Sequence, residues 1–145
     1  MRLNLIYCKN NENIIGYDNN LLFKIPEDIK YFKKVTSQEY KKGYQNIVIM
    51  GYNTWLSLPE KFKPLKGRIN IVITKNHFKD MKMEIENLKV FNDFDFCYEY
   101  LCKEEENGNL LGEKFIIGGG QLYNYVNEKY ISSINKIYET LINYD

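Results

Sequence analysis

One carboxylate in this sequence is predicted to share a helical face with apolar side chains. The stretch from Ile25 to Thr36 reads IPEDIKYFKKVT, and its proline suits the first turn of a helix, where a missing N–H costs nothing. Helical spacing places Asp28 beside Ile29 and Phe32, and it puts the lysines of the stretch on the opposite side. Since a buried carboxylate needs a hydrogen-bonding partner, a ligand can supply one. Asp28 is therefore a candidate for chemistry, and the alternative is an acid that only favours the helix dipole.

Three consecutive glycines, Gly118 to Gly120, stand between an apolar run and a stretch with helical character. Glycines allow a ligand to approach the backbone closely, and the helix start behind them offers free N–H groups to a pyrophosphate. The motif matches neither of the familiar glycine-rich phosphate-binding patterns. A plain tight turn therefore stays open as the alternative.

Two further apolar runs end in small polar or charged residues. Residues 51–54 read GYNT and lead into a short helix, and Thr74-Lys75 ends another run. Two helix N-termini that point into one cleft would suit a long polyanionic cofactor, and a hydroxyl beside a cation could hold one more phosphate. The alternatives are capping of the helix by Asn53 or Thr54, and an exposed strand end.

Arg68 is the only arginine besides Arg2 in a chain that otherwise uses lysine as its cation. A guanidinium can bind a carboxylate with two parallel hydrogen bonds, which an ammonium cannot do. Arg68 is thus a candidate for recognition of a substrate carboxylate, and a surface salt bridge is the equally open alternative.

Apolar runs and helical periodicities alternate along the whole chain. Strands are predicted at Leu3–Cys8, Asn46–Gly51, Ile69–Thr74, Leu88–Phe91, Lys114–Ile117 and Ile134–Ile142, and helices at Ile25–Thr36, Asn53–Leu58, Asp93–Glu106 and Gln121–Val126. This alternation predicts an α/β fold with a mainly parallel sheet and right-handed crossovers. Ligands of such sheets bind beyond the carboxyl ends of the strands. We therefore expect Cys8, residues 51–54, Thr74-Lys75 and residues 118–123 to converge on one cleft.

Composition narrows the function classes. The 145 residues suit a single domain, 1–145, and the net charge of +1 gives no reason to expect nucleic acid as a partner. No apolar run approaches the length of a membrane span, so no membrane is expected either. Three cysteines without a C-x-x-C pair and a single histidine argue against a metal site. Reduced thiols favour a cytoplasmic protein.

Taken together, the motifs resemble those of dihydrofolate reductase. They occur in the family's order and cover nearly the whole chain: Ile15-Gly16, residues 25–36, residues 48–61 (VIMGYNTWLSLPEK), residues 64–70 (PLKGRIN) and residues 116–123 (IIGGGQLY). The resemblance implies a three-layer α/β fold with flanking helices, and NADPH-dependent reduction of dihydrofolate to tetrahydrofolate. Antifolates would be further ligands.

The resemblance also implies roles for individual residues. Asp28 would be catalytic, gripping the pterin ring and polarising or protonating it. The substrate would be bound by Ile6, Tyr7, Ile29, Phe32, Leu58, Leu65, Arg68, Ile117 and Tyr123, with Arg68 on the glutamate carboxylate and Thr140 supporting Asp28. NADPH would be bound by Cys8, Ile15, Gly16, Gly51, Tyr52, Asn53, Thr54, Thr74, Lys75, Gly118, Gly119, Gly120, Gln121, Leu122 and Tyr123.

The chain departs from the family pattern in three places. Phe23 stands where the family usually has tryptophan, and Tyr52 stands where a basic residue is common, so a preference for NADPH over NADH would depend mainly on Lys75. The family's sheet normally continues with two more strands, which suggests that the domain is C-terminally incomplete and that a continuation or partner chain covers the last strand. Alternatives are a non-catalytic nucleotide- or partner-binding subunit, the reductase part of a bifunctional reductase–thymidylate synthase, and a pyrimidine reductase of riboflavin synthesis.

Overall fold

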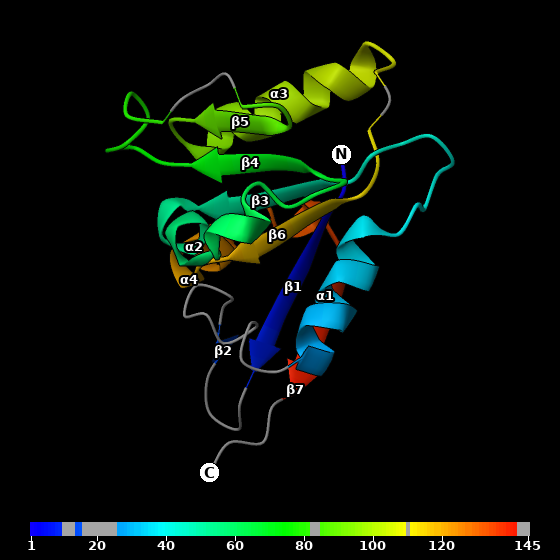
Figure 1. Ribbon diagram of the computed structural model, residues 1–145. Coiled ribbons are helices and arrows are strands. Elements are labelled where there is room, and N and C mark those ends of the chain that lie inside the picture. The colour runs from blue at the N-terminus through cyan, green and yellow to red at the C-terminus, as the bar shows by residue number, and fades with distance from the viewer. Residues whose placement is uncertain (10–13, 16–25, 82–84, 110, 142–145) are drawn as a thin grey trace.

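Seven strands form a single sheet in the computed structural model, which describes residues 1–9, 14–15, 26–81, 85–109 and 111–141 (Figure 1). The strand order is β2-β1-β6-β3-β4-β5, and β7 pairs with the edge of β1 that faces away from β6. All described pairings are parallel except that of β1 with β2. The strands are β1 (Leu3–Lys9), β2 (Ile14–Ile15), β3 (Ile47–Gly51), β4 (Ile69–Ile73), β5 (Leu88–Phe91), β6 (Lys114–Gly118) and β7 (Ile134–Leu141).

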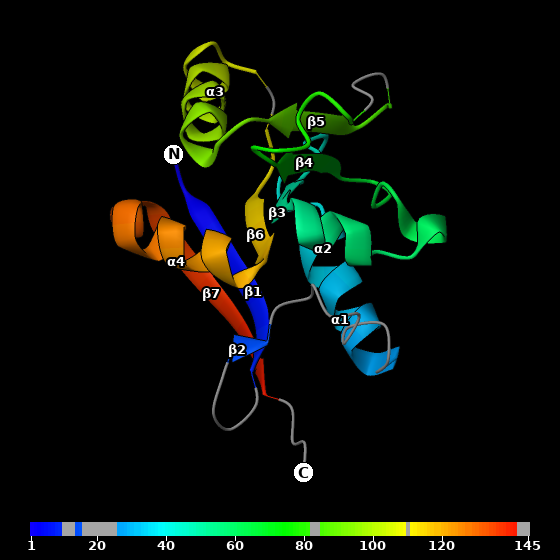
Figure 2. The same ribbon diagram turned by 90° about the vertical axis from the view of Figure 1, so that its left-hand side faces the viewer.

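Helices cover both faces of the sheet, so the architecture has three layers (Figure 2). The helices α1 (Pro26–Ser37) and α2 (Tyr52–Ser57) lie on one side, and α3 (Phe94–Glu106) and α4 (Gly120–Lys129) lie on the other. Short 3₁₀ helices follow α2 and α4, at Glu60–Phe62 and Ile131–Ser133. The mainly parallel three-layer α/β fold predicted from the sequence is confirmed.

Alternation along the strands divides the core into two clusters. Val48 and Met50 of β3 pack with Phe32 of α1, whereas Ile47 and Ile49 pack toward α3 and α4. Because helices cover both faces, both sets of side chains are buried, which explains the continuous apolar runs in the sequence.

Every strand and helix predicted from the sequence is present, with ends that shift by a few residues. Two predicted boundaries, Ile25 and Ile142, lie outside the described residues. The two-residue strand β2 was not predicted, because two residues carry no periodicity. The helix α2 begins at Tyr52 and its N-cap is Gly51, so the prediction that Asn53 or Thr54 caps this helix is wrong.

The sheet divides at its centre, between β1 and β6. These strands pair only through Asn4 and Leu5 of β1, and farther along β1 the strand β2 takes the same side at Cys8 and Lys9. From β1 the chain crosses to β3 in one direction, and from β6 it crosses to β7 in the other. Such a switch point is where open α/β sheets bind ligands.

No helix among the described residues has the length and apolar character needed to cross a membrane.

Candidate functional site

Two glycine-bearing strand ends touch at the carboxyl edge of the sheet. Met50 of β3 is in register with Gly118 of β6, and a Cβ atom built on Gly51 would lie 3.7 Å from the backbone nitrogen of Gly119. The Gly118–Gly119 peptide bond is cis, and Gly119 is the N-cap of α4, which begins at Gly120. The glycines therefore form the junction between β6 and α4, as expected from the sequence.

A hydroxyl group in α2, the helix that follows Gly51, lacks a partner among the described residues. Thr54 is fully buried in α2, and no residue in the described part of the chain forms a hydrogen bond with its Oγ1 atom. A buried hydroxyl without a partner is costly, so it marks a place where a ligand oxygen would complete the bonding. This orphan and the bare glycine backbone fit a pyrophosphate, whereas Asn53 and Gln121 are exposed and Leu122 is buried in the core.

The end of β4 is tied to α2 by a pair of stacked rings. The rings of Tyr52 and His77 are 4.1 Å apart at an interplanar angle of 11°. Thr74 is buried, and its Oγ1 accepts a hydrogen bond of 3.1 Å from the backbone N–H of His77. Lys75 is exposed beside them. The structure thus brings residues 51–54 and Thr74-Lys75 together through a histidine to which the sequence assigned no role.

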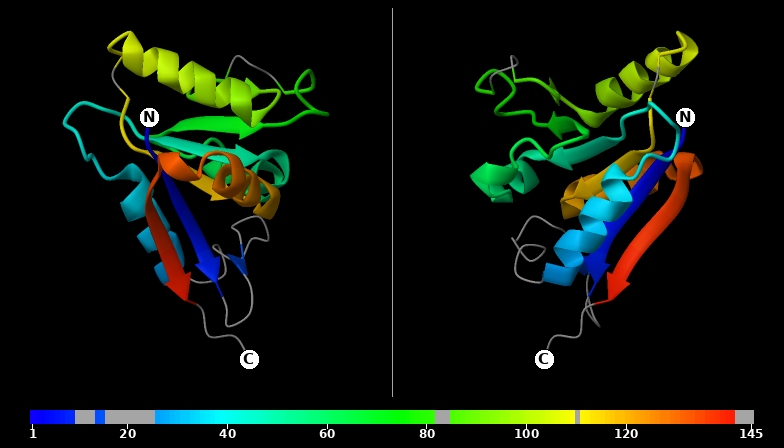
Figure 3. Two further views of the ribbon diagram at one scale, coloured as in Figure 1. Left: turned by 180° about the vertical axis from the view of Figure 1, so that it is seen from behind. Right: turned by 45° about the vertical axis from the view of Figure 1, so that its right-hand side comes forward.

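Asp28 lies in the first turn of α1. The start of this helix lies beside the carboxyl ends of β1 and β7 (Figure 3). Its Oδ2 atom is buried, and no described residue forms a hydrogen bond with that atom. Burial raises the pKa of the Asp28 carboxyl above its ordinary value, and the neighbouring charge of Glu27 raises it further. One oxygen of this acid is therefore desolvated without a partner among the described residues, while Lys30, Lys33 and Lys34 are exposed.

A groove with several cationic side chains on its walls lies beside α1. Its volume is about 220 Å³, and it is lined by Ile29, Phe32, Lys33, Lys61, Phe62, Leu65, Lys66 and Arg68. Leu65 and Phe32 are buried in one core cluster with Leu58, Ile6 and Ile117. These apolar residues, all predicted to contact the substrate, pack in one cluster, of which Phe32 and Leu65 line the groove.

Arg68 is buried at this groove and is held by uncharged groups. Its Nη1 donates to Thr36 Oγ1 and its Nε donates to the Lys66 carbonyl, both at 2.9 Å. Burial lowers the pKa of the guanidinium to about 10. Among the described residues no carboxylate lies within ion-pair distance, and only 4% of Arg68 is exposed. The alternative of a surface salt bridge is therefore wrong, and a ligand carboxylate would complete the pair.

Tyr7 is the predicted site residue whose side chain the structure places elsewhere. Strand alternation puts Ile6 and Cys8 on the α1 face, and Tyr7 on the opposite face with Tyr123. The two rings are 5.7 Å apart, and the Tyr7 hydroxyl donates to Glu139. Only the backbone of Tyr7 can reach the face that carries Asp28. Tyr123 stays tied to the β1–β6 switch point, because its hydroxyl donates to the Ile6 carbonyl at 2.6 Å.

Three further predictions concern the rim of the site. Thr140 pairs with Cys8 in the sheet register, but it forms no hydrogen bond with the buried Oδ2 of Asp28. Ile15 pairs with Cys8 from the other side, in β2. Gly16 and Phe23 lie outside the described residues.

Sequence reasoning missed the partners that hold the site together. Thr36 anchors Arg68 and its hydroxyl donates to the Phe32 carbonyl, yet the sequence showed only that it shares a helical face with Asp28. The lysines of the groove come from two separate segments, so only the folded chain brings them together.

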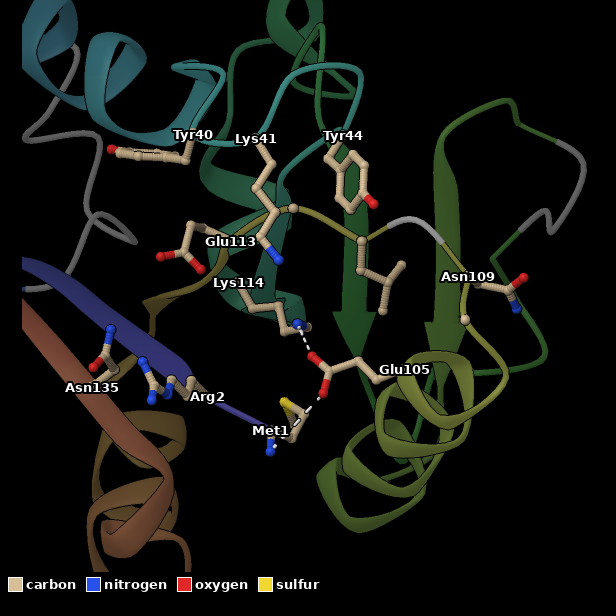
Figure 4. A pocket seen from close by; sticks show the side chains of 13 residues that line it. Met1, Arg2, Tyr40, Lys41, Tyr44, Glu105, Asn109, Glu113, Lys114 and Asn135 are labelled. Atoms are coloured by element: carbon tan, nitrogen blue, oxygen red, sulfur yellow. Dashed lines mark hydrogen bonds and ion pairs between the residues drawn. The ribbon is translucent and has the colours of Figure 1, made fainter.

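A larger hollow of about 670 Å³ lies at the opposite edge of the sheet, where β1 and β6 begin (Figure 4). Lys114 is buried there and forms a short ion pair with Glu105, and Arg2 and Lys41 line the same space. None of the predicted site residues lines this hollow. The candidate site is therefore the smaller groove and the carboxyl edge of the sheet.

Comparisons with known proteins identify the family to which this fold belongs. The family model described as dihydrofolate reductase matches residues 2–145. The dihydrofolate reductase of Schistosoma mansoni is 39% identical over 125 residues, which are 85% of this chain and 63% of that protein. That of Pneumocystis carinii is 38% identical over 128 residues, which are 83% of this chain and 60% of the relative. The chain thus spans about three fifths of the length of these relatives.

Similarity extends to bifunctional proteins and to solved structures. The bifunctional dihydrofolate reductase-thymidylate synthase of Glycine max is 34% identical over 75% of this chain and 20% of its own length. The solved Schistosoma mansoni dihydrofolate reductase superposes with a TM-score of 0.83 at 35% identity, covering 100% of this chain and 75% of that one. Because the family match covers almost the whole sequence and the fold agrees, the chain belongs to the dihydrofolate reductase family.

Proposed function

We propose that this protein reduces dihydrofolate to tetrahydrofolate with NADPH, and that Asp28 binds and polarises the pterin. The observation that carries the proposal is the buried Oδ2 of Asp28, which has no hydrogen-bond partner among the described residues. The pterin ring offers an amino group and a ring N–H side by side, and a carboxylate can accept from both. A ligand of this kind removes the cost of burying the acid.

The spacing along α1 supports the same substrate. Thr36, which holds Arg68, follows Asp28 by eight residues, or about 12 Å along a helix axis. Dihydrofolate is an elongated molecule with an amino-substituted ring at one end and a glutamate at the other. Asp28 would bind the ring, the apolar cluster of Phe32, Leu58 and Leu65 would contact the aminobenzoyl group, and Arg68 would bind the α-carboxylate.

The raised pKa of Asp28 suits the chemistry of this reaction. Addition of hydride to a C=N bond is easier when the nitrogen carries a proton. A carboxyl group whose pKa is raised by burial retains a proton more readily, or favours the protonated form of a bound ring. Asp28 would therefore promote the reaction by holding a proton or charge next to the ring, and the apolar cluster would exclude water.

NADPH would be held by the carboxyl ends of β3, β4 and β6, and when bound it supplies the hydride. The backbone at Gly51, Gly118 and Gly119 and the orphaned hydroxyl of Thr54 fit the pyrophosphate. Ile6 and Ile117, at the β1–β6 switch point, would lie nearest the reacting rings, with Tyr123 positioned by its bond to Ile6.

The reaction is assigned to the cytoplasm. All three cysteines lie in the described part of the chain and none forms a disulfide. This is the usual state in a reducing compartment.

The test is loss of NADPH absorbance that depends on added dihydrofolate. Asp28→Asn should abolish the rate, whereas the control Glu99→Gln, which removes an exposed carboxylate on α3, should leave it within about twofold. Calorimetry with methotrexate separates the alternatives. Tight binding without turnover would contradict catalysis by this chain, and absence of binding of both drug and NADPH would favour a non-catalytic partner-binding subunit.

A further inference from the structure

The stacked pair Tyr52–His77 is the part of the carboxyl edge that the proposed reaction leaves unused. Tyr52 is the first residue of α2 and directly follows Gly51, and His77 lies in the turn after β4. The nearly parallel rings place the imidazole against Tyr52, and the hydrogen bond from the His77 backbone to Thr74 holds the turn that carries it. A side chain that is stacked on a helix residue and carried by a supported turn is pre-organised for recognition.

The imidazole is exposed and faces few charges. About 45% of its side chain is exposed, and its Nδ1 atom lies 3.5 Å from Oδ2 of Asp80. The groups that contact it are the Tyr52 ring from α2 and the Asp80 carboxylate from its own turn. The same turn also carries the exposed ammonium groups of Lys75 and Lys79. No described residue forms a hydrogen bond with its Nε2 atom, so that atom is available to a ligand.

The position of the pair follows from the direction in which a dinucleotide must lie. The reducing ring has to reach the substrate held by Asp28, next to β1, and the pyrophosphate fits the backbone around Gly51 and Gly119. Across the sheet the order is β1, β6, β3, β4. The adenosine half therefore extends toward the end of β4, where His77 lies. This step rests on the proposed function.

We propose that His77, held by the ring of Tyr52, is a specificity-determining residue that recognises the 2′-phosphate of the adenosine ribose and so selects NADPH over NADH. The phosphate carries about two negative charges and strong acceptor oxygens. A protonated imidazole would donate a charge-assisted hydrogen bond to it, and the phosphate would in turn favour protonation of the ring. Tyr52 stands where the family commonly has a basic residue, and the sequence alone left the preference for NADPH to Lys75. In this proposal the imidazole stacked on Tyr52 supplies a second charge in the same turn as Lys75.

The test compares two probes that differ only in this group, 2′,5′-ADP and 5′-AMP, whose dissociation constants are measured by calorimetry near pH 6 and pH 8. The preference for 2′,5′-ADP should fall about tenfold in His77→Gln at the lower pH, and less at the higher pH. His77→Lys should restore the preference at both values. Because the phosphate itself titrates in this range, each variant is compared with the parent chain at the same pH.

Two further variants test the role of the stack. Tyr52→Phe keeps a flat ring and should retain the preference, whereas Tyr52→Leu should lose part of it, because the imidazole is no longer held. Lys103→Gln on α3 removes one positive charge on the far side of the sheet and serves as the control, with no change expected.

Nuclear magnetic resonance gives a readout that does not depend on activity. His77 is the only histidine, so its ring signals need no assignment. Their titration midpoint should move to higher pH with 2′,5′-ADP and not with 5′-AMP. Equal shifts with both probes, or an unchanged preference in His77→Gln, would overturn the assignment of His77 and leave the reductase intact. If neither nucleotide bound, the proposed cofactor site itself would be contradicted, and the assignment with it.

Discussion

Two aspartates, one on each side of the sheet, have opposite surroundings. Asp95 on α3 accepts hydrogen bonds from the hydroxyls of Tyr125 and Tyr130 and from the ammonium of Lys129, and these donors lower its pKa to about 2. Asp28 on α1 has a buried oxygen without a partner among the described residues, and burial raises its pKa. Asp95 therefore joins α3 to α4 and to Tyr130, the residue that follows α4. Asp28 joins nothing within the described chain.

The cations follow the same division. Lys129 is half exposed and pairs with Asp95, whereas Arg68 is buried and lacks a carboxylate among the described residues. A folded chain keeps uncompensated buried charges at a cost in stability, so they mark positions that a ligand completes. Satisfied charges of the same residue types need no ligand. The comparison therefore separates the functional from the structural side of the molecule, and each prediction below changes one member of it.

The largest expected effect is on catalysis. Asp28→Asn should lower kcat/KM for dihydrofolate by about a hundredfold or more, because proton transfer or polarisation by a positioned acid contributes about 10² to 10⁴ to a rate. Asp95→Asn should leave kcat/KM within about twofold. Steady-state rates with saturating NADPH measure both. Equal losses in the two variants would mean that Asp28 acts through stability alone.

The next effect is on substrate affinity. Arg68→Gln should raise KM for dihydrofolate by about ten- to a hundredfold with little change in kcat, since it removes a charge-assisted contact remote from the reacting ring. Arg68→Lys should recover only part of the affinity, because an ammonium cannot form the bidentate pair. Lys129→Gln is the matched control on the other face, and a rise of KM there would contradict the division.

The features of the fold and of the candidate site that could be predicted from the sequence are those that depend on residues close together in the chain. The parallel sheet, its helices and the edge that carries the site follow from local periodicities and from the rule that ligands bind at carboxyl ends. Asp28 could be singled out because it shares a helical face with Phe32 within one turn. The expectation of an NADPH-linked reductase came from family motifs, which a single sequence carries in full.

Other features depend on contacts between distant segments. The bond from Thr36 to Arg68 spans 32 residues, and the stack of Tyr52 on His77 joins a helix to a loop after another strand. Membership of a motif says nothing of strand alternation, so the motif did not reveal that the side chains of Ile6 and Tyr7 lie on opposite faces of the sheet. The cap of α2 was missed since Gly51, with no side chain, precedes the polar residues that usually cap.

Two buried threonines extend the comparison to uncharged groups. Thr36 has a hydroxyl that both donates and accepts, whereas the hydroxyl of Thr54 has no partner among the described residues. Thr54→Val should weaken NADPH binding by about tenfold and leave the stability of the free protein unchanged or slightly higher. Thr36→Val should lower stability by about 1 kcal/mol and leave NADPH binding unchanged. Calorimetry and thermal unfolding of each variant distinguish these outcomes, and weaker NADPH binding in both would contradict them.

The smallest expected effect is on the free energy of unfolding and its dependence on pH. It measures the contrast directly, because it has opposite signs for the two aspartates. The pKa of Asp28 is raised in the folded state, so its contribution to stability is present below the ordinary value near pH 4 and is lost as the pH rises through the raised value. The pKa of Asp95 is lowered to about 2, so its contribution is present above pH 4 and is lost as the pH falls toward 2.

At pH 7, Asp28→Asn should therefore be more stable than the parent chain by about 1 kcal/mol, and Asp95→Asn should be less stable by under about 1 kcal/mol, since its pair is exposed to solvent. Both differences should shrink in acid, because Asp28 is protonated below about pH 4 and Asp95 loses its charge as the pH falls toward 2. Denaturant midpoints measured across this range, without ligand, give the two signs. Addition of a tightly bound antifolate should make the parent chain more stable than Asp28→Asn, because only the carboxylate of the parent gains a hydrogen-bonded partner in the ligand.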